Sequence, residues 1–142
     1  MDQAVKECIL KAVKKEPYAL ALNMELVELE KGYSAVEMTY DPETMNNIYG
    51  RVHGGAIYAL IDEAFETAGQ TDGTIAVALN INVTYVSSPE AGARLRAEAQ
   101  KVSQTKKTAA YDIKVKDQNG QLIALCHALA FCTGKPIPFL SK

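Results

Sequence analysis

The sequence predicts an α+β fold in which a curled antiparallel β-sheet wraps around one long helix, with a short helix at the N-terminus. Residues 55–69 carry the one long helical pattern in the interior of the chain, two strand-like runs precede it, and four more follow Gly73. Because a single apolar helix cannot cover both faces of such a sheet, the sheet should curl around it. The uncovered edge or face then favours a second subunit.

The first part of the chain predicts a helix and a hairpin. An amphipathic pattern predicts a helix over residues 2–15, which Pro17 should end. Two strand-like runs within residues 20–40 flank Lys31-Gly32, which indicates a β-hairpin. Residues 41–52 are polar and contain Pro and Gly, so they predict a loop.

The central helix has a broad apolar face with one acid at its edge. At 100° per residue its apolar side chains fall within an arc of about 160°, and Glu63, Glu66 and Thr67 are expected opposite. Asp62 lies at the edge of that arc, about 40° from Tyr58. Partial burial there would raise the pKa of Asp62 and make it a better base.

The chain after Gly73 alternates as strands do. Every second residue from Ile75 to Tyr85 is apolar and is expected on one face. Asn119-Gly120 predicts a hairpin turn before the last, mainly apolar strand. That strand should be central or covered on both faces, and His127 within it should be a packing histidine with a satisfied hydrogen bond.

Composition limits the class of protein. The chain has 142 residues, 48% of them hydrophobic, which predicts one domain over residues 1–142. The net charge of -2 argues against nucleic acid or an anionic membrane as a partner. Apolar stretches fall short of the roughly 20 residues of a membrane span, and the N-terminus lacks a signal-peptide core, so we expect a cytoplasmic protein. Cys8, Cys126 and Cys132 are expected to be reduced packing residues.

The residues suited to chemistry lie at the start and middle of the central helix. The chain has no Gly-rich phosphate loop, no G-x-S-x-G elbow and no metal-spaced Cys/His set, so we expect neither metal nor cofactor. Gly54 and Gly55 leave backbone N–H donors at the positive end of the helix, where an oxyanion could bind. The same glycines could also simply form a tight entry into the helix, and Asp62 could be an ordinary solvated acid.

The spacing of Gly54 and Asp62 predicts a site shared by two protomers. Asp62 follows Gly54 by eight residues, which separates them by about 12 Å along a helix. One carbonyl cannot contact both in the same chain, so the donor and the acid should come from two antiparallel helices of a homodimer. Thioester hydrolysis fits one acid and one helix start, because the thiolate leaves without much help from a general acid.

The segment NIYGRVHGGAIYALIDEAF, residues 47–65, and the later S-P-x-x-G-x-x-L pattern resemble the hotdog-fold acyl-CoA thioesterases of the phenylacetic-acid-degradation (PaaI-like) group. The resemblance covers roughly residues 20–132 and implies a hotdog core over about 20–133, working as a dimer and commonly as a tetramer. It implies an acyl-CoA substrate, with coenzyme A as part of it, and an aromatic (phenylacetyl-type) or medium-chain acyl group.

The resemblance also implies roles for individual residues. Asp62 would be the base or nucleophile, Gly54 would donate its N–H to the thioester carbonyl, Asn47 would position the water or thioester, and His53 would support the turn. A further set is expected to contact the substrate: Gly55, Tyr58, Thr67, Arg94, Lys106 and Lys107. Some relatives carry a Ser or Thr that places the water, where this chain has Ala78 and Glu66, so Thr67 is the remaining candidate.

Two other functions stay open from the sequence. A hotdog hydratase or dehydratase would use an Asp/His pair, but Asp62 and His53 lie about 13 Å apart along one helix. A noncatalytic acyl-CoA-binding module is the other alternative, although the chain shows no second domain that would transmit a signal.

Overall fold

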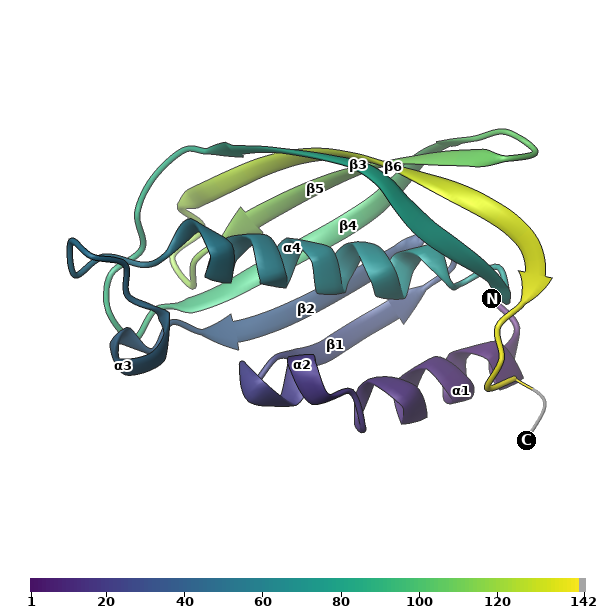
Figure 1. Cartoon of the computed structure of the whole chain (residues 1–142), viewed down its shortest axis with the longest axis horizontal. Coiled ribbons are helices and arrows are strands. Elements are labelled where there is room, and N and C mark those ends of the chain that lie inside the picture. The colour runs from purple at the N-terminus through teal and green to yellow at the C-terminus, as the bar shows by residue number, and fades with distance from the viewer. Residues whose placement is uncertain (141–142) are drawn as a thin grey trace.

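The computed structural model describes residues 1–140, in which a six-stranded antiparallel sheet curves around one long helix (Figure 1). The helices are α1 (Gln3–Val13), α2 (Pro17–Ala21), α3 (Pro42–Met45) and α4 (Gly54–Gly69). The strands are β1 (Glu25–Glu30), β2 (Tyr33–Thr39), β3 (Thr74–Tyr85), β4 (Arg94–Gln104), β5 (Thr108–Lys116) and β6 (Leu122–Pro136). Their order in the sheet is β1-β2-β4-β5-β6-β3, so β1 and β3 are the two edges.

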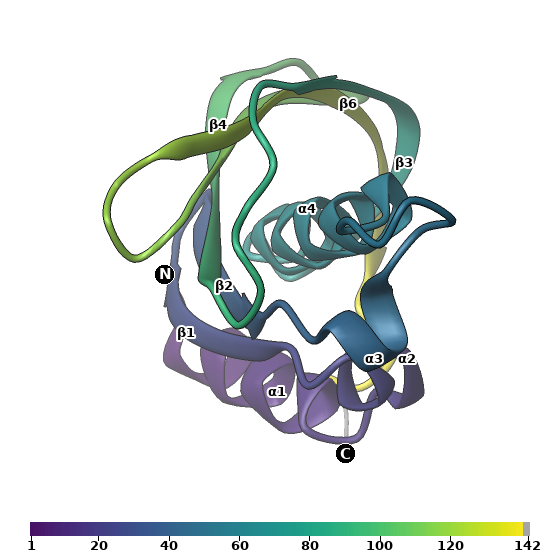
Figure 2. The same cartoon turned by 90° about the vertical axis from the view of Figure 1, so that its left-hand side faces the viewer.

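The predicted wrapping of the sheet is confirmed. Viewed along α4, the sheet forms an arc around the helix, and α1 lies outside the sheet near β1 (Figure 2). The curled antiparallel sheet with a long enclosed helix is the hotdog fold. β6 lies between β5 and β3, so the prediction of a central last strand is also confirmed.

Local sequence sets the ends of the N-terminal elements. The Asp2 carboxylate accepts the N–H of Val5 at 3.1 Å and caps α1. α1 ends at Val13, and Pro17 lies in the first turn of the short helix α2, which includes Leu20, where a strand-like run was expected to begin. Asn23, with a φ of 52°, follows α2, and the first strand begins only at Glu25. The loop over residues 41–52 likewise contains the short helix α3.

Both predicted hairpin turns are present. Gly32 joins β1 to β2 with a φ of 70°, and Gly120 lies between β5 and β6 with a φ of 79°. Both values lie in the left-handed region that glycine adopts without a Cβ clash.

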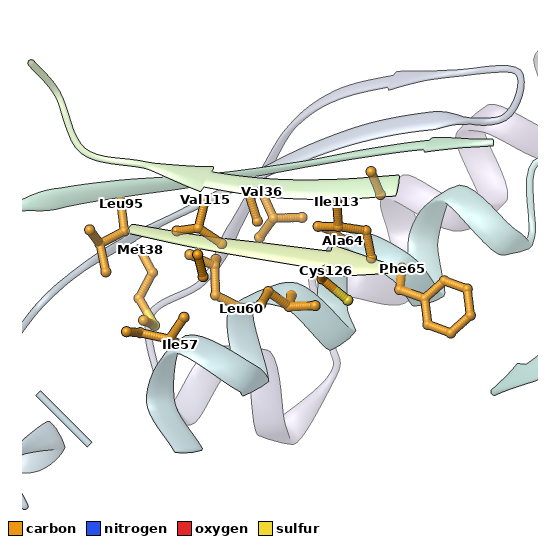
Figure 3. Close-up of a cluster of buried hydrophobic side chains, with 14 of the residues drawn as sticks. Val36, Met38, Ile57, Leu60, Ala64, Phe65, Leu95, Ile113, Val115 and Cys126 are labelled. Carbon is orange, nitrogen blue, oxygen red and sulfur yellow. The ribbon is translucent and has the colours of Figure 1, made fainter. Parts of the chain in front are cut away.

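Apolar side chains from α4 and the inner face of the sheet form the core (Figure 3). Leu60 and Ala64 of α4 are fully buried, and the Phe65 ring packs edge-to-face on Tyr111 with centroids 5.2 Å apart. Burial of each large side chain contributes about 1.5–3 kcal/mol. The Ser34 hydroxyl donates to the Ala64 carbonyl at 2.6 Å, which ties α4 to β2. The core therefore fixes which side of α4 remains open.

The predicted apolar face of β3 is wrong in its first half. Val77 and Leu79 are 46% and 57% exposed, whereas Ile81 and Val83 pack against the core. The pairing of β3 with β6 shifts register between Ala78 and Asn80. A bulge inserts one unpaired residue and so reverses which side chains face inward.

The predicted polar face of α4 is wrong for two of its three residues, since only Glu66 is exposed. Glu63 is 3% exposed and Thr67 2% exposed, because the end of α1 and the α1–α2 connection lie against this side of the helix. His127 was expected to be a packing residue but is exposed. It is satisfied, with Nδ1 2.9 Å from the Asp112 Oδ1 atom, but its side chain lies on an exposed face of β6.

Two further expectations concern the chain as a whole. Cys8, Cys126 and Cys132 are free thiols, as predicted. Among the described helices, none is both long and apolar enough to cross a membrane.

Candidate active site

Two of the hollows beside α4 contain the predicted catalytic residues. The first, which we call the N-terminal hollow, has a volume of about 420 Å³ and is lined by residues that include Asn47, Gly54, Tyr85 and Ser87. The second, the mid-helix hollow, has a volume of about 220 Å³ and is lined by residues that include Asp62, Glu66, Ala78 and Ala130. The predicted oxyanion donor and the predicted acid therefore lie in different hollows of one protomer.

The start of α4 presents the N–H of Gly54 to the N-terminal hollow. His53 is the N-cap, and its Nδ1 accepts the N–H of Gly55 at 2.9 Å. The Ala56 N–H bonds to the His53 carbonyl at 2.9 Å. Within residues 1–140 the N–H of Gly54 has no acceptor. His53 thus supports the turn as expected, and Gly54 rather than Gly55 can donate to a ligand.

Tyr85, at the end of β3, closes over this helix start. Its hydroxyl donates to the Gly54 carbonyl at 2.9 Å. A Cβ on residue 54 would lie 3.1 Å from the Tyr85 ring and 3.2 Å from its hydroxyl oxygen. Glycine at position 54 therefore permits the close approach of this side chain.

Asn47 shapes the loop before α4. Its Oδ1 accepts the N–H of Tyr49 at 2.9 Å and the N–H of Arg51 at 3.1 Å. The Asn47 N–H donates to the Arg51 carbonyl at 2.7 Å. With its oxygen committed to this turn, the amide NH₂ of Asn47 is the group that can donate into the N-terminal hollow.

Asp62 is partly buried in the mid-helix hollow, and burial raises its pKa. No lysine, arginine or histidine within residues 1–140 forms an ion pair with it. Tyr58, one helical turn earlier, is 39% exposed, and its pKa is raised by burial and then by the charge of Asp62. An acid with a raised pKa and no cation beside it is suited to act as a base.

The mid-helix hollow contains no hydroxyl from Thr67. The Thr67 hydroxyl is buried and donates to the carbonyls of Glu63 and Ala64, at 2.8 and 3.2 Å. Ala78 and Glu66 do line the hollow. Burial, with the charges of Glu16 and Asp62, raises the pKa of Glu66 to about 7. The hollow therefore places two acids together, one helical turn apart.

The three basic residues that we expected at coenzyme A phosphates have different surroundings. Arg94 bonds to Glu37 at 3.0 Å and to Glu25 at 3.1 Å, and it lines neither hollow. Lys106 and Lys107 are exposed in the β4–β5 turn. The register of β5, β6 and β3 brings this turn to the sheet end that holds Val77, a residue of the mid-helix hollow. Their placement leaves the two lysines, but not Arg94, free for a phosphate.

Tyr85 and Glu66 were missed as site residues. Tyr85 ends an alternating strand and gives no sequence signal for its contact with Gly54, because the contact spans 31 residues. Glu66 could have been found, since it follows Asp62 by one helical turn and therefore shares its side of α4.

The comparisons define the family. Residues 49–124, more than half of the chain, match the thioesterase superfamily. The chain therefore belongs to the thioesterase superfamily and is a thioester hydrolase. The expected resemblance to the PaaI-like group is confirmed.

Individual relatives agree with this assignment. The chain is 33% identical over 107 residues to the acyl-coenzyme A thioesterase PaaI of Escherichia coli, a match that covers 75% of this chain and 76% of that protein. A solved structure of E. coli PaaI, from the phenylacetic acid degradation operon, has a TM-score of 0.89 at 28% identity and covers 94% of this chain and 96% of that one. A structure of smu.793 from Streptococcus mutans bound to acetyl CoA has a TM-score of 0.75 at 30% identity, covering 81% and 92% of the two chains.

Proposed function

We propose that this protein hydrolyses the thioester of an acyl-CoA whose acyl group is aromatic, of the phenylacetyl type, or of medium chain length. The likeness to E. coli PaaI, named an acyl-coenzyme A thioesterase, and to a protein that binds acetyl CoA supports this substrate class. The single observation that carries the mechanism is the division of the two key groups between separate hollows along α4.

In the proposed mechanism Asp62 of one protomer faces the start of α4 of its partner. The free N–H of Gly54 donates to the thioester carbonyl oxygen and stabilises the oxyanion of the tetrahedral intermediate. Asp62 takes a proton from the attacking water, or attacks the carbonyl carbon itself. The C–S bond then breaks and the thiolate leaves, taking up the proton that the water released. In the route of direct attack the acyl group is first left on Asp62 as a mixed anhydride, which water hydrolyses, so both routes give the free acid and the thiol of coenzyme A. The amide NH₂ of Asn47 helps to hold the water or the carbonyl.

A homodimer supplies this arrangement. β3 is an edge strand of 12 residues, and its exposed side chains include Val77 and Leu79. Val77 also lines the mid-helix hollow. An antiparallel copy of β3 would satisfy the free edge and would bring a second α4 beside the hollow.

A second pairing of dimers would cover the outer face of the sheet. Leu125 and Phe131 of β6 are 39% and 36% exposed there. We therefore propose a homotetramer built from two such dimers. Light scattering after size exclusion should give four times the chain mass of 15.4 kDa.

A thiol-release assay tests the proposed reaction. Phenylacetyl-CoA and octanoyl-CoA serve as substrates, with Asp62→Asn and Asp62→Ala beside the parent and Asp112→Asn as a matched control on the outer face of the sheet. Both Asp62 variants should fold and lose at least about 100-fold in kcat, the size expected for loss of a general base or nucleophile. The control should keep the parent rate. Full activity in Asp62→Ala would remove the assignment of Asp62.

A further inference from the structure

Three carboxylates meet on the side of α4 that α1 and α2 cover, and one of them, Glu66, also borders the mid-helix hollow. Glu16 is the N-cap residue of α2, and Glu63 and Glu66 lie three residues apart on one side of α4. One carboxylate oxygen from each of the three lies within 4.8 Å of the others. Two segments that are distant in sequence therefore bring three acids to one point.

Glu63 is the buried member of this cluster and lacks a partner. It is 3% exposed, and its Oε1 atom has no hydrogen-bond partner within the described part of the chain. None of the ion pairs formed by residues 1–140 includes Glu16, Glu63 or Glu66. A buried carboxylate without a donor or cation is costly, and a cation bound beside Glu63 would remove that cost.

The geometry suits a divalent cation. Oxygen ligands lie about 2.3–2.6 Å from Ca²⁺, so two ligands of one Ca²⁺ ion are at most about 5 Å apart, and the spacing within the cluster satisfies that limit. Ligands of Mg²⁺ lie about 2.0–2.1 Å from the ion, so for Mg²⁺ the three oxygens must approach to about 4 Å. All three donors are hard carboxylate oxygens, with no thiolate or imidazole among them, which favours Ca²⁺, Mg²⁺ or Mn²⁺ over Zn²⁺.

An ion could reach the cluster from a neighbouring cavity. Glu16 and Glu66 line a cavity of about 480 Å³ between α1, α4 and β3. Its other walls are mainly apolar and include Ile9, Val13 and Ile75. The acids are the only carboxylates that line it within residues 1–140, so a cation entering this cavity would meet them first.

We propose that Glu16, Glu63 and Glu66 bind a divalent cation that joins the α1–α2 connection to α4. The ion is structural, since Asp62 is not one of its ligands. Glu66 also lines the mid-helix hollow, so the bound ion fixes the position of one wall residue beside Asp62. This site departs from our expectation of no metal, which rested on Cys/His spacing and could not detect three acids from two separate segments.

Metal titration of the full chain tests the proposal. The protein is treated with EDTA, desalted and titrated separately with CaCl₂, MgCl₂ and MnCl₂ by calorimetry, and its melting temperature is measured with and without each ion. We expect one of the three to bind saturably, with one ion per chain, and to raise the melting temperature. Glu63→Gln and Glu16→Gln should each weaken that binding at least tenfold.

The controls separate this result from non-specific binding and from misfolding. Glu90→Gln removes an exposed acid elsewhere and should bind the ion like the parent. If Glu63→Gln does not fold, Glu16→Gln, whose side chain is only partly buried, gives the same comparison. Absence of saturable binding in the parent, or equal affinity in the parent and in both cluster variants, would overturn the proposal. Because no readout is enzymatic, failure here leaves the thioesterase mechanism untouched.

Discussion

The carboxylates on the outer face of the sheet and those along α4 have opposite surroundings. On the sheet, Arg94 and Arg96 pair with Glu25, Glu28 and Glu37 of β1 and β2, and Arg96 also pairs with Glu98 of its own strand. Burial alone would raise the pKa of Glu37, but the two arginines hold it below its ordinary value. Along α4, Asp62, Glu63 and Glu66 have no such partner, and the pKa of each is raised, first by burial.

This difference separates acids that hold the fold together from acids that remain free to act. A paired carboxylate is a weak base, because its cation stabilises the charged form. An unpaired, partly buried one keeps its basicity at a cost in stability. Both kinds occur in this chain, and the unpaired ones gather on the helix that lines both hollows.

Of the acids along α4, Glu63 should destabilise the folded state most when its carboxyl is charged. Burial, with the charges of Glu16 and Glu66, raises its pKa to about 8. A carboxyl that holds its proton more tightly in the folded state loses stability as the pH rises through that pKa. In chelator at about pH 9, Glu63→Gln should raise the free energy of unfolding by about 1–3 kcal/mol, because an unsatisfied buried charge is removed.

Urea denaturation of the parent and Glu63→Gln at several pH values gives that measurement. The gain should shrink towards about pH 5, where the carboxyl is protonated in the folded state. A gain that does not change with pH would show that Glu63 is not the titrating group.

A cation placed beside Asp62 should turn this unpaired acid into a paired one with a lower pKa. Tyr58 lies one turn before Asp62, so Tyr58→Lys places an ammonium group beside the carboxylate. The lower pKa and basicity should reduce kcat about tenfold. Steady-state kinetics of Tyr58→Lys and of Tyr58→Met, which is similar in length but uncharged, separates the charge from the lost ring. Equal rates in the two variants would contradict a role for the basicity of Asp62.

Substitution of a paired acid should have the smallest effect on stability and activity. Glu37→Gln removes one partner from Arg94 and Arg96, and we expect a loss of at most about 1 kcal/mol at pH 7 with no change in kcat. Because the pKa of Glu37 is lowered in the folded state, its contribution is present above the ordinary value of 4.5 and is lost as the pH falls below it. Thermal melts of parent and variant should therefore converge in acid, and a difference that grows in acid would contradict this pairing.

The sequence was sufficient for the hotdog architecture and for naming candidate site residues on α4. Alternation of period two and one helix of period 3.6 predicted the sheet and α4, and glycine marked the two hairpin turns correctly. Helical spacing was enough to select Asp62 and Gly54 as candidates, because both lie on the single helix α4. Their catalytic roles stay predictions.

The predictions that were wrong or incomplete concern contacts between segments that are distant in the sequence. The bulge in β3 reversed the exposure of Val77 and Leu79, which strict alternation cannot foresee. Glu63 was expected in solvent, but the α1–α2 connection covers it. Likewise, the approach of Tyr85 to Gly54 joins residues 31 positions apart. Helical and strand periods describe one element at a time, so they give no information on which segment covers which.

Subunit complementation tests the shared site most directly. Gly54→Pro removes the N–H donor at a position where proline is tolerated, because residue 54 is the first of the helix. Gly54→Ala is the control, since it keeps the N–H but adds the same Cβ contact with Tyr85. Gly54→Pro should lose about 10²–10³ in kcat, and Gly54→Ala much less.

Gly54→Pro and Asp62→Asn chains, each inactive alone, are then unfolded together and refolded as a mixture. Random pairing makes half of the dimers mixed, each with one intact site, so about a quarter of the parent activity should return. A mixture no more active than its two components would contradict a site built from two protomers.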